Sequence, residues 1–111
     1  MSGYQRSVPA SESLPPARVR ALVNRFLLSQ VGSVFVAGTP ELDVSTHLWR
    51  VPILYNPPDF VGGEAGEAQV SALTGDLQQY TPVAKMRKRA AELHERHQAQ
   101  IHTAFLRASK K

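Results

Sequence analysis

The sequence contains no cysteine among its 111 residues, which excludes disulfide frameworks and thiolate metal sites. This absence fits a reducing compartment, and we expect a cytoplasmic protein. No apolar run approaches the roughly 20 residues that a membrane helix needs, so we expect no membrane partner. The N-terminus carries Arg6 but no apolar core segment, so a secretory signal is not expected there.

Signatures of catalysis are also missing. The GxSxG pattern of a nucleophile elbow is absent, and so is the GxxxxGK(S/T) pattern of a phosphate loop. Asp43, Ser45 and His47 lie within one short loop, whereas the members of a catalytic triad normally converge from separate elements. His94 and His97 are three residues apart, but no acidic residue completes a known metal spacing. We therefore expect no enzyme activity, no cofactor and no metal site.

Positive charge is concentrated at the C-terminal end of the chain. The net charge is +4, but residues 82–111 hold eight basic and two acidic residues. A basic cluster at the start of a helix is opposed by the helix macrodipole, and such a placement can indicate an acidic partner. The candidate residues for binding a partner or nucleic acid are Lys85, Arg87, Lys88, Arg89 and Arg96.

The first third of the chain predicts a tail and a helix. Residues 1–13 are rich in Ser, Pro and Gly without apolar periodicity, so we expect a disordered tail before a single domain over residues 14–111. Pro15 and Pro16 suit a helix start, and Gly32 suits the position just after a helix end. The apolar residues between them fall at helical spacing: Val19, Leu22, Val23, Phe26 and Leu27.

Two segments of alternating polarity flank a loop rich in Pro and Gly. They predict that Leu48–Tyr55 pairs antiparallel with Gly66–Ala72. Pro52 cannot donate to a sheet, which favours an edge position or an outward-facing N–H at this point. Short strands at residues 34–36 and 77–80 would complete a sheet of three to four strands. The expected core face of the first segment holds Trp49, Val51, Ile53 and Tyr55.

The C-terminal segment predicts one long helix. Thr81 is a hydroxyl cap and Pro82 suits the first helical position.

Residues 37–46, with Gly38 and Pro40, are expected to form a loop. The whole order predicts an α+β fold with an N-terminal helix, an antiparallel sheet and a long C-terminal helix, the helices lying on one face of the sheet.

The predicted C-terminal helix is too long for the sheet. Thirty residues give a rod of about 45 Å, whereas short strands reach only about 17–20 Å. We expect Val83–Leu93 to pack on the sheet and the later apolar positions to extend past it. Such a patch often marks an interface, which predicts a homodimer. The residues expected to contribute to self-association are His97, Ile101 and Phe105.

The segment Val70–Leu77, VSALTGDL, resembles the strand and turn V-D-A-x-T-G-x-L of PepSY-type domains, with Ser71 in place of the usual acidic residue. The resemblance covers roughly Pro16–Tyr80 and implies a non-catalytic binding or inhibitory module. The segment from Trp49 to Leu77 is also similar to small uncharacterised bacterial proteins, and this similarity implies an antitoxin-like role.

Two functions are therefore expected. The first is a small non-enzymatic protein-binding module that acts through its sheet edge or its long C-terminal helix. The alternative is an antitoxin-like regulator that binds a nuclease-type toxin and uses its basic helix on DNA.

Overall fold

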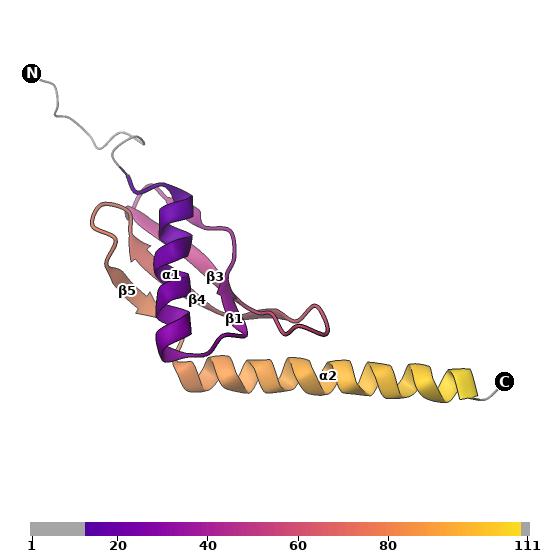
Figure 1. Ribbon diagram of the computed structural model, residues 1–111. Helices are drawn as coiled ribbons and strands as arrows, with labels where there is room; N and C mark the ends of the chain where they lie inside the picture. The colour runs from indigo at the N-terminus through magenta and orange to yellow at the C-terminus, as the bar shows by residue number, and fades with distance from the viewer. Residues whose placement is uncertain (1–12, 110–111) are drawn as a thin grey trace, which may run out of the picture.

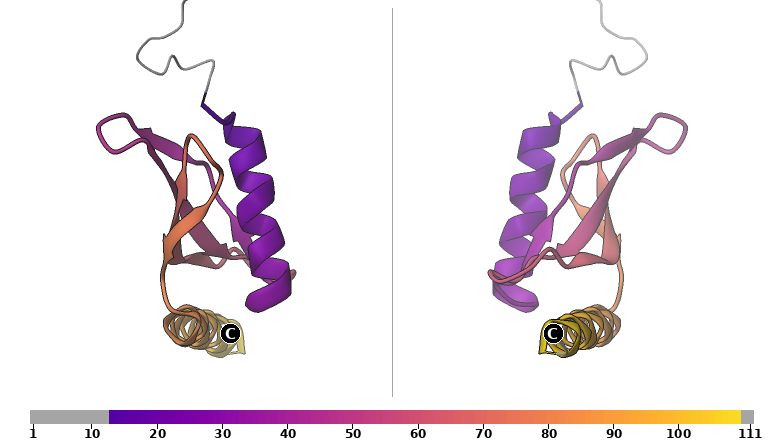
Figure 2. Two further views of the ribbon diagram at one scale, coloured as in Figure 1. Left: turned by 90° about the vertical axis from the view of Figure 1, so that its left-hand side faces the viewer. Right: turned by 90° about the vertical axis from the view of Figure 1, so that its right-hand side faces the viewer.

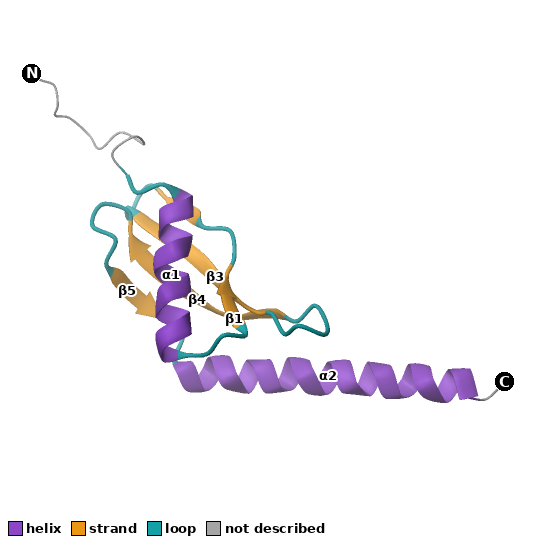
Figure 3. Ribbon diagram, in the orientation of Figure 1, coloured by secondary structure: helices purple, strands orange, loops and turns teal. Residues whose placement is uncertain are grey.

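The structure, a computed structural model, describes residues 13–109 and has the expected α+β fold. A helix precedes the strands of one antiparallel sheet, and a long helix follows them (Figures 1 and 3). The bounds are Pro16–Gln30 for α1, Phe35–Ala37 for β1, Glu41–Asp43 for β2, Leu48–Tyr55 for β3, Gly63–Ser71 for β4, Leu77–Tyr80 for β5 and Val83–Ser109 for α2. The expected tail over residues 1–13 lies, apart from Ser13, outside the described residues.

The predicted hairpin forms the middle of the sheet. The strand order is β1-β3-β4-β5, all pairs are antiparallel, and β2 also pairs with β3. Trp49 lies opposite Val70, as the alternation in the two segments predicted. The expected loop over residues 37–46 was wrong in part, because Glu41–Asp43 pairs with β3. A strand of three residues is too short to show a period in the sequence.

Pro52 occupies a central strand rather than an edge. Its carbonyl accepts a hydrogen bond from the Gly38 N–H at 2.7 Å, on the side where β1 has ended and β2 has not begun. Because the N and O atoms of one strand residue point to the same side, the Pro52 nitrogen faces this break. The missing N–H of Pro52 therefore costs no hydrogen bond between strands. Proline is tolerated here because its nitrogen faces this break, which agrees with the outward-facing nitrogen expected from the sequence.

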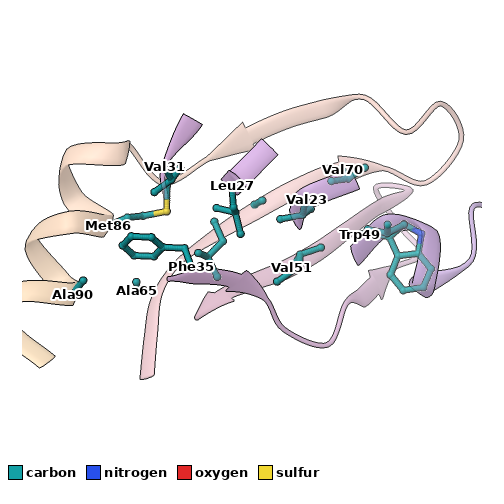
Figure 4. Close-up of a cluster of buried hydrophobic side chains, with 14 of the residues drawn as sticks. Val23, Leu27, Val31, Phe35, Trp49, Val51, Ala65, Val70, Met86 and Ala90 are labelled. Carbon is teal, nitrogen blue, oxygen red and sulfur yellow. The ribbon is translucent and has the colours of Figure 1, made fainter. Parts of the chain in front are cut away.

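One face of the sheet packs against α1. Val19, Val23 and Leu27 of the helix are buried against Val51 and Val70 of the sheet (Figure 4). The helix ends where Gly32, with a φ of +151°, donates its N–H to the Leu27 carbonyl at 2.8 Å. The predicted core face of β3 is confirmed: three of its residues are buried, and Tyr55 is half-buried.

The helix α2 does not share the face that α1 covers. Figure 2 shows α1 along one face of the sheet and α2 nearly end-on beneath the end of the sheet. The close approach of β4 and α2 occurs at Gly66, where a Cβ atom would lie 2.8 Å from Thr81 Cβ and 3.0 Å from Met86 Cγ. Among the described residues no helix covers the second face of the sheet, which we call the open face (Figure 2).

Thr81 has a different role from the predicted helix cap. Its hydroxyl accepts a hydrogen bond from the Glu67 N–H at 3.0 Å and lies 3.4 Å from the Glu67 carbonyl. The Thr81 N–H also donates to that carbonyl at 2.9 Å. The prediction was wrong because it considered only the helix that follows, whereas the side chain is used to fix the chain to β4.

Candidate interaction surface on the C-terminal helix

The first half of α2 completes the hydrophobic core at the end of the sheet. Met86 is fully buried, and Ala90 and Leu93 are buried at the next positions on the same side of the helix. Figure 4 shows Met86 and Ala90 facing Phe35 and Ala65 of the sheet layer. Residues three and four apart lie on one side of a helix, so the sequence pattern alone predicted this buried stripe.

The loop between β3 and β4 continues this contact outward along α2. Phe60 lies flat on the imidazole of His97, with ring centroids 3.8 Å apart and planes 7° apart. The same ring lies 6.0 Å from the ring of His94 and 6.0 Å from that of Tyr55, and Tyr55 in turn lies 5.8 Å from Phe35. A series of aromatic contacts therefore connects the core to the middle of α2.

The second half of α2, residues 96–109, extends away from the domain (Figure 1). We call this part the distal half. The buried stripe of the helix continues on it through Ile101 and Phe105, whose exposed fractions are 50% and 67%. Leu106, 45% exposed, points to a different side of the helix, and the neighbouring loop residue Val61 is 94% exposed. The apolar stripe that is covered up to His97 is thus uncovered beyond it.

The charge of the distal half has one sign. The sequence from Arg96 to the C-terminus contains Arg107 and two lysines but no Asp or Glu. Arg96 and Arg107 line one side of the helix together with Ala104, about 120–180° round the helix from Ile101 and Phe105. The two lysines and the side chain of Ala108 lie outside the described residues. The distal half thus presents an apolar side and a basic side that face different directions.

The basic residues that the sequence predicted as a binding cluster differ in the contacts that they make. Arg87 donates to the Val31 carbonyl at 3.1 Å, where a positive charge also interacts favourably with the C-terminal end of α1. Arg89 forms an ion pair with Glu92 at 3.4 Å. For Lys85, Lys88 and Arg96, no ion pair is found within residues 13–109.

The open face of the sheet is acidic. Glu41, Asp43 and Glu64 lie on this face, and with them Glu67, whose carboxylate forms an ion pair with Arg50 at 3.3 Å. The hydrogen bond from Arg50 lowers the pKa of Glu67, and the same bond raises the pKa of Arg50. A shallow groove on this face is lined by Thr39, Glu41, Arg50, Pro52, Glu64 and Glu67.

The residues considered for catalysis are engaged in a local turn. Asp43 accepts hydrogen bonds from the Ser45 hydroxyl at 2.7 Å and the Ser45 N–H at 3.1 Å, and the hydroxyl bond lowers the pKa of Asp43. His47 is exposed at the end of the same turn, with a φ of +57°. No side-chain hydrogen bond joins this imidazole to Ser45 or Asp43. Asp43 and Ser45 thus form an ordinary Asx turn.

The structure clarifies the histidine pair on α2 as well. His94 and His97 both contact the Phe60 ring. Across the part of the chain that the structure describes, no group of three or more His, Asp or Glu side chains is arranged to hold a metal ion. In the same part of the chain, no helix is long and apolar enough to cross a membrane.

Sequence reasoning missed two components of this surface. Phe60 and Val61 were treated as loop residues, although an aromatic and a valine between Pro58 and Gly62 are unusual in a purely solvated loop. Glu41 was missed because β2 was not predicted.

Comparisons with protein-family models, with curated proteins and with solved structures found no match.

Proposed function

We propose that this protein is a small non-enzymatic protein-binding module that self-associates through the distal half of α2. The apolar stripe of α2 supports this proposal. Its side chains are covered at Met86, Leu93 and His97 but exposed at Ile101 and Phe105. The resemblance to PepSY-type domains, which implies a binding module, points in the same direction. We also propose a cytoplasmic location, because the lack of cysteine suits a reducing compartment.

The length of α2 explains why its own domain cannot cover this stripe. The helix has 27 residues and is therefore about 40 Å long. Phe60 contacts α2 at His97, and residues 98–107 beyond it are all exposed, although the helix continues to Ser109. Fully burying an exposed side chain such as Ile101 or Phe105 contributes about 1.5–3 kcal/mol, and this contribution favours association through the stripe.

A second copy of the chain is the occupant that we propose. The distal half has no acidic residue, and its basic side, which holds Arg96 and Arg107, needs an acidic partner surface. The chain itself provides such a surface, because Glu41, Asp43 and Glu64 lie on the open face of the sheet. Charge complementarity of this kind sets the partner and the orientation of an interface.

Phe105→Glu tests this function. The variant places a charge in the apolar stripe, so it should be a folded monomer under conditions where the parent is a dimer. The measurement is sedimentation velocity at tens of micromolar, with circular dichroism to verify that α2 remains helical.

Ala91→Glu is the matched control, because it adds the same charge to α2 at an exposed position of the first half, outside the distal half. It should sediment like the parent. A monomeric parent at tens of micromolar would refute the proposed self-association.

The second candidate function is the antitoxin-like regulator that binds DNA. It is favoured by Lys85, Lys88 and Arg96, for which no ion pair is found in the described residues. If they bind phosphates, log K should fall with log salt, and the variant with all three changed to Gln should reduce that slope by about three. No retardation of any duplex at low salt would exclude this candidate.

A further inference from the structure

We infer that the outer edge of β5 binds an extended, acidic segment of another protein as an additional strand of the sheet. This inference goes beyond the proposed self-association through α2 and does not depend on it. β5 forms one edge of the sheet, since the strand order ends with it (Figure 1). Its residues, Leu77–Tyr80, include no charged residue and no proline, which are features that commonly block an exposed edge.

The backbone of β5 offers hydrogen bonds to such a strand at Tyr80. The Thr81 N–H donates to the Glu67 carbonyl at 2.9 Å, so these two residues form a hydrogen-bonded pair between the strands. In an antiparallel ladder the next pair, Ala68 with Tyr80, points its backbone groups away from the partner strand. The N–H and the carbonyl of Tyr80 therefore face outward from the edge of the sheet.

The opposite edge of the sheet is closed by side chains of α1. The Ala37 N–H of β1 donates to Asn24 Oδ1 at 2.7 Å, and the Arg20 guanidinium donates to the Ala37 carbonyl at 3.5 Å. Within residues 13–109, no side-chain hydrogen bond of this kind reaches the backbone of Leu77–Tyr80. The edge at β5 is therefore the one that remains open to a further strand.

A strand added to β5 would have an apolar groove on one face of the sheet and a polar groove on the other. On the side that α1 covers, Leu22 and Phe26 of the helix line a groove with Leu77 of β5. On the open face, Gln69 and Gln79 line a polar groove. Because side chains of a strand point to the two faces in turn, the segment that fits here alternates apolar and polar residues.

Two arginines beside the apolar groove favour an acidic partner. Arg18, Leu22 and Arg25 follow one another at spacings of four and three, so they lie on one side of α1. Both arginines are exposed and belong to neither ion pair of the described residues, and α1 contains no acidic residue. Asp76 precedes β5, but its carboxylate accepts a hydrogen bond from the Thr74 hydroxyl at 3.0 Å. Carboxylates of a partner would therefore pair with the arginines.

Pairing of β5 with the β5 of a second copy is the less favourable arrangement. The two-fold axis of such a pair stands perpendicular to the sheet, so both α1 helices would lie on the same face, on either side of the new contact. Arg18 and Arg25 of the two copies would then approach each other, and like charges repel. The partner that we infer is instead a different protein, whose extended segment carries carboxylates on either side of an apolar residue.

The probe for this inference is a synthetic peptide with blocked ends, Gly-Thr-Glu-Thr-Val-Thr-Glu-Thr-Gly. When it is extended, the valine and both glutamates lie on one face, with the glutamates about 14 Å apart. Arg18 and Arg25 are about 10 Å apart along α1, within reach of both glutamates. The readout is hydrogen exchange by NMR. At a peptide concentration about ten times Kd, exchange of the Tyr80 amide should slow about tenfold, while that of the Ala37 amide should not change.

Arg18→Glu with Arg25→Glu tests the charge requirement. This variant should bind the peptide about tenfold more weakly or worse, and replacing both glutamates of the peptide by lysine should restore the affinity. Arg96→Glu with Arg107→Glu, at exposed positions of α2, is the matched control and should bind the original peptide like the parent. Thermal melting establishes that both variants are folded.

Three results would overturn the inference. The first is no binding of the peptide at millimolar concentration, and the second is binding that leaves the Tyr80 amide unprotected. The third is protection of Tyr80 without peptide that grows with protein concentration, since a second copy would then occupy the edge. None of these results bears on self-association through α2, which Phe105→Glu tests separately.

Discussion

The ring of Phe60 lies stacked on the imidazole of His97, with centroids 3.8 Å apart. This contact connects the loop between β3 and β4 to the middle of α2, at the point where the helix leaves the domain. The covered part of the apolar stripe ends here, and the exposed part begins with Ile101. The exposed part of α2 therefore begins just beyond this one contact.

Phe60→Ala should loosen the middle of α2 without unfolding the sheet. The stacked pair contributes about 0.5–1.5 kcal/mol beyond the area that it buries. Hydrogen exchange should accordingly be faster at the amides from His97 to Ile101, and unchanged at those of β3. Val61→Ala, at a side chain that is 94% exposed, is the control and should have little effect. Unchanged exchange in Phe60→Ala would show that the stack does not hold the helix.

Trp49→Ala should be strongly destabilising, by about 3–5 kcal/mol, because the indole is 8% exposed within the core. Trp49→Phe keeps an aromatic ring but removes the hydrogen bond that Nε1 donates to the Leu14 carbonyl at 3.1 Å. Loss of that bond should lower the free energy of unfolding by about 1 kcal/mol, and the smaller ring also loses some packing. Urea denaturation gives both values. A cost for Trp49→Ala below that of Trp49→Phe would contradict the observed burial.

Gly66→Ala should disturb the junction between β4 and α2. A Cβ atom at this position would lie 2.8 Å from Thr81 Cβ and 2.9 Å from Thr81 Oγ1. Relieving such overlap costs about 1–3 kcal/mol, measured as a lower midpoint in urea. Gly63→Ala in the same strand is the control, since its new Cβ would meet Leu93 only at 3.4 Å. Equal stability of the two variants would argue against close packing at Gly66.

The ion pair of Arg50 and Glu67 predicts a pH dependence. Hydrogen bonding from Arg50 lowers the pKa of Glu67 in the folded state, so the pair stabilises the fold fully above the unfolded pKa of about 4.3. This contribution is lost as the pH falls through the lower, folded pKa. NMR titration should find a higher Glu67 pKa in Arg50→Gln than in the parent. An identical pKa in both proteins would mean that the pair does not form in solution.

The sequence by itself determined the elements whose information is local. Alternation over Leu48–Tyr55 and Gly66–Ala72 predicted the central hairpin and the core position of Trp49, because side chains in a strand point to opposite faces in turn. The spacing of Val19, Val23 and Leu27 predicted the buried side of α1, because residues three and four apart lie on one side of a helix. The length of the last helical pattern predicted that α2 would extend past the sheet.

Tertiary structure alone decided the contacts between segments distant in the sequence. Whether Arg87 faces solvent or the Val31 carbonyl depends on where the end of α1 lies, and no local pattern contains that information. The same holds for Phe60 on His97, for β2 beside β3 and for the Thr81 hydroxyl on Glu67. The candidate surface thus has a component visible in the sequence, the apolar and basic helix. The acidic open face appears only once folding brings Glu41 and Glu64 to one face of the sheet.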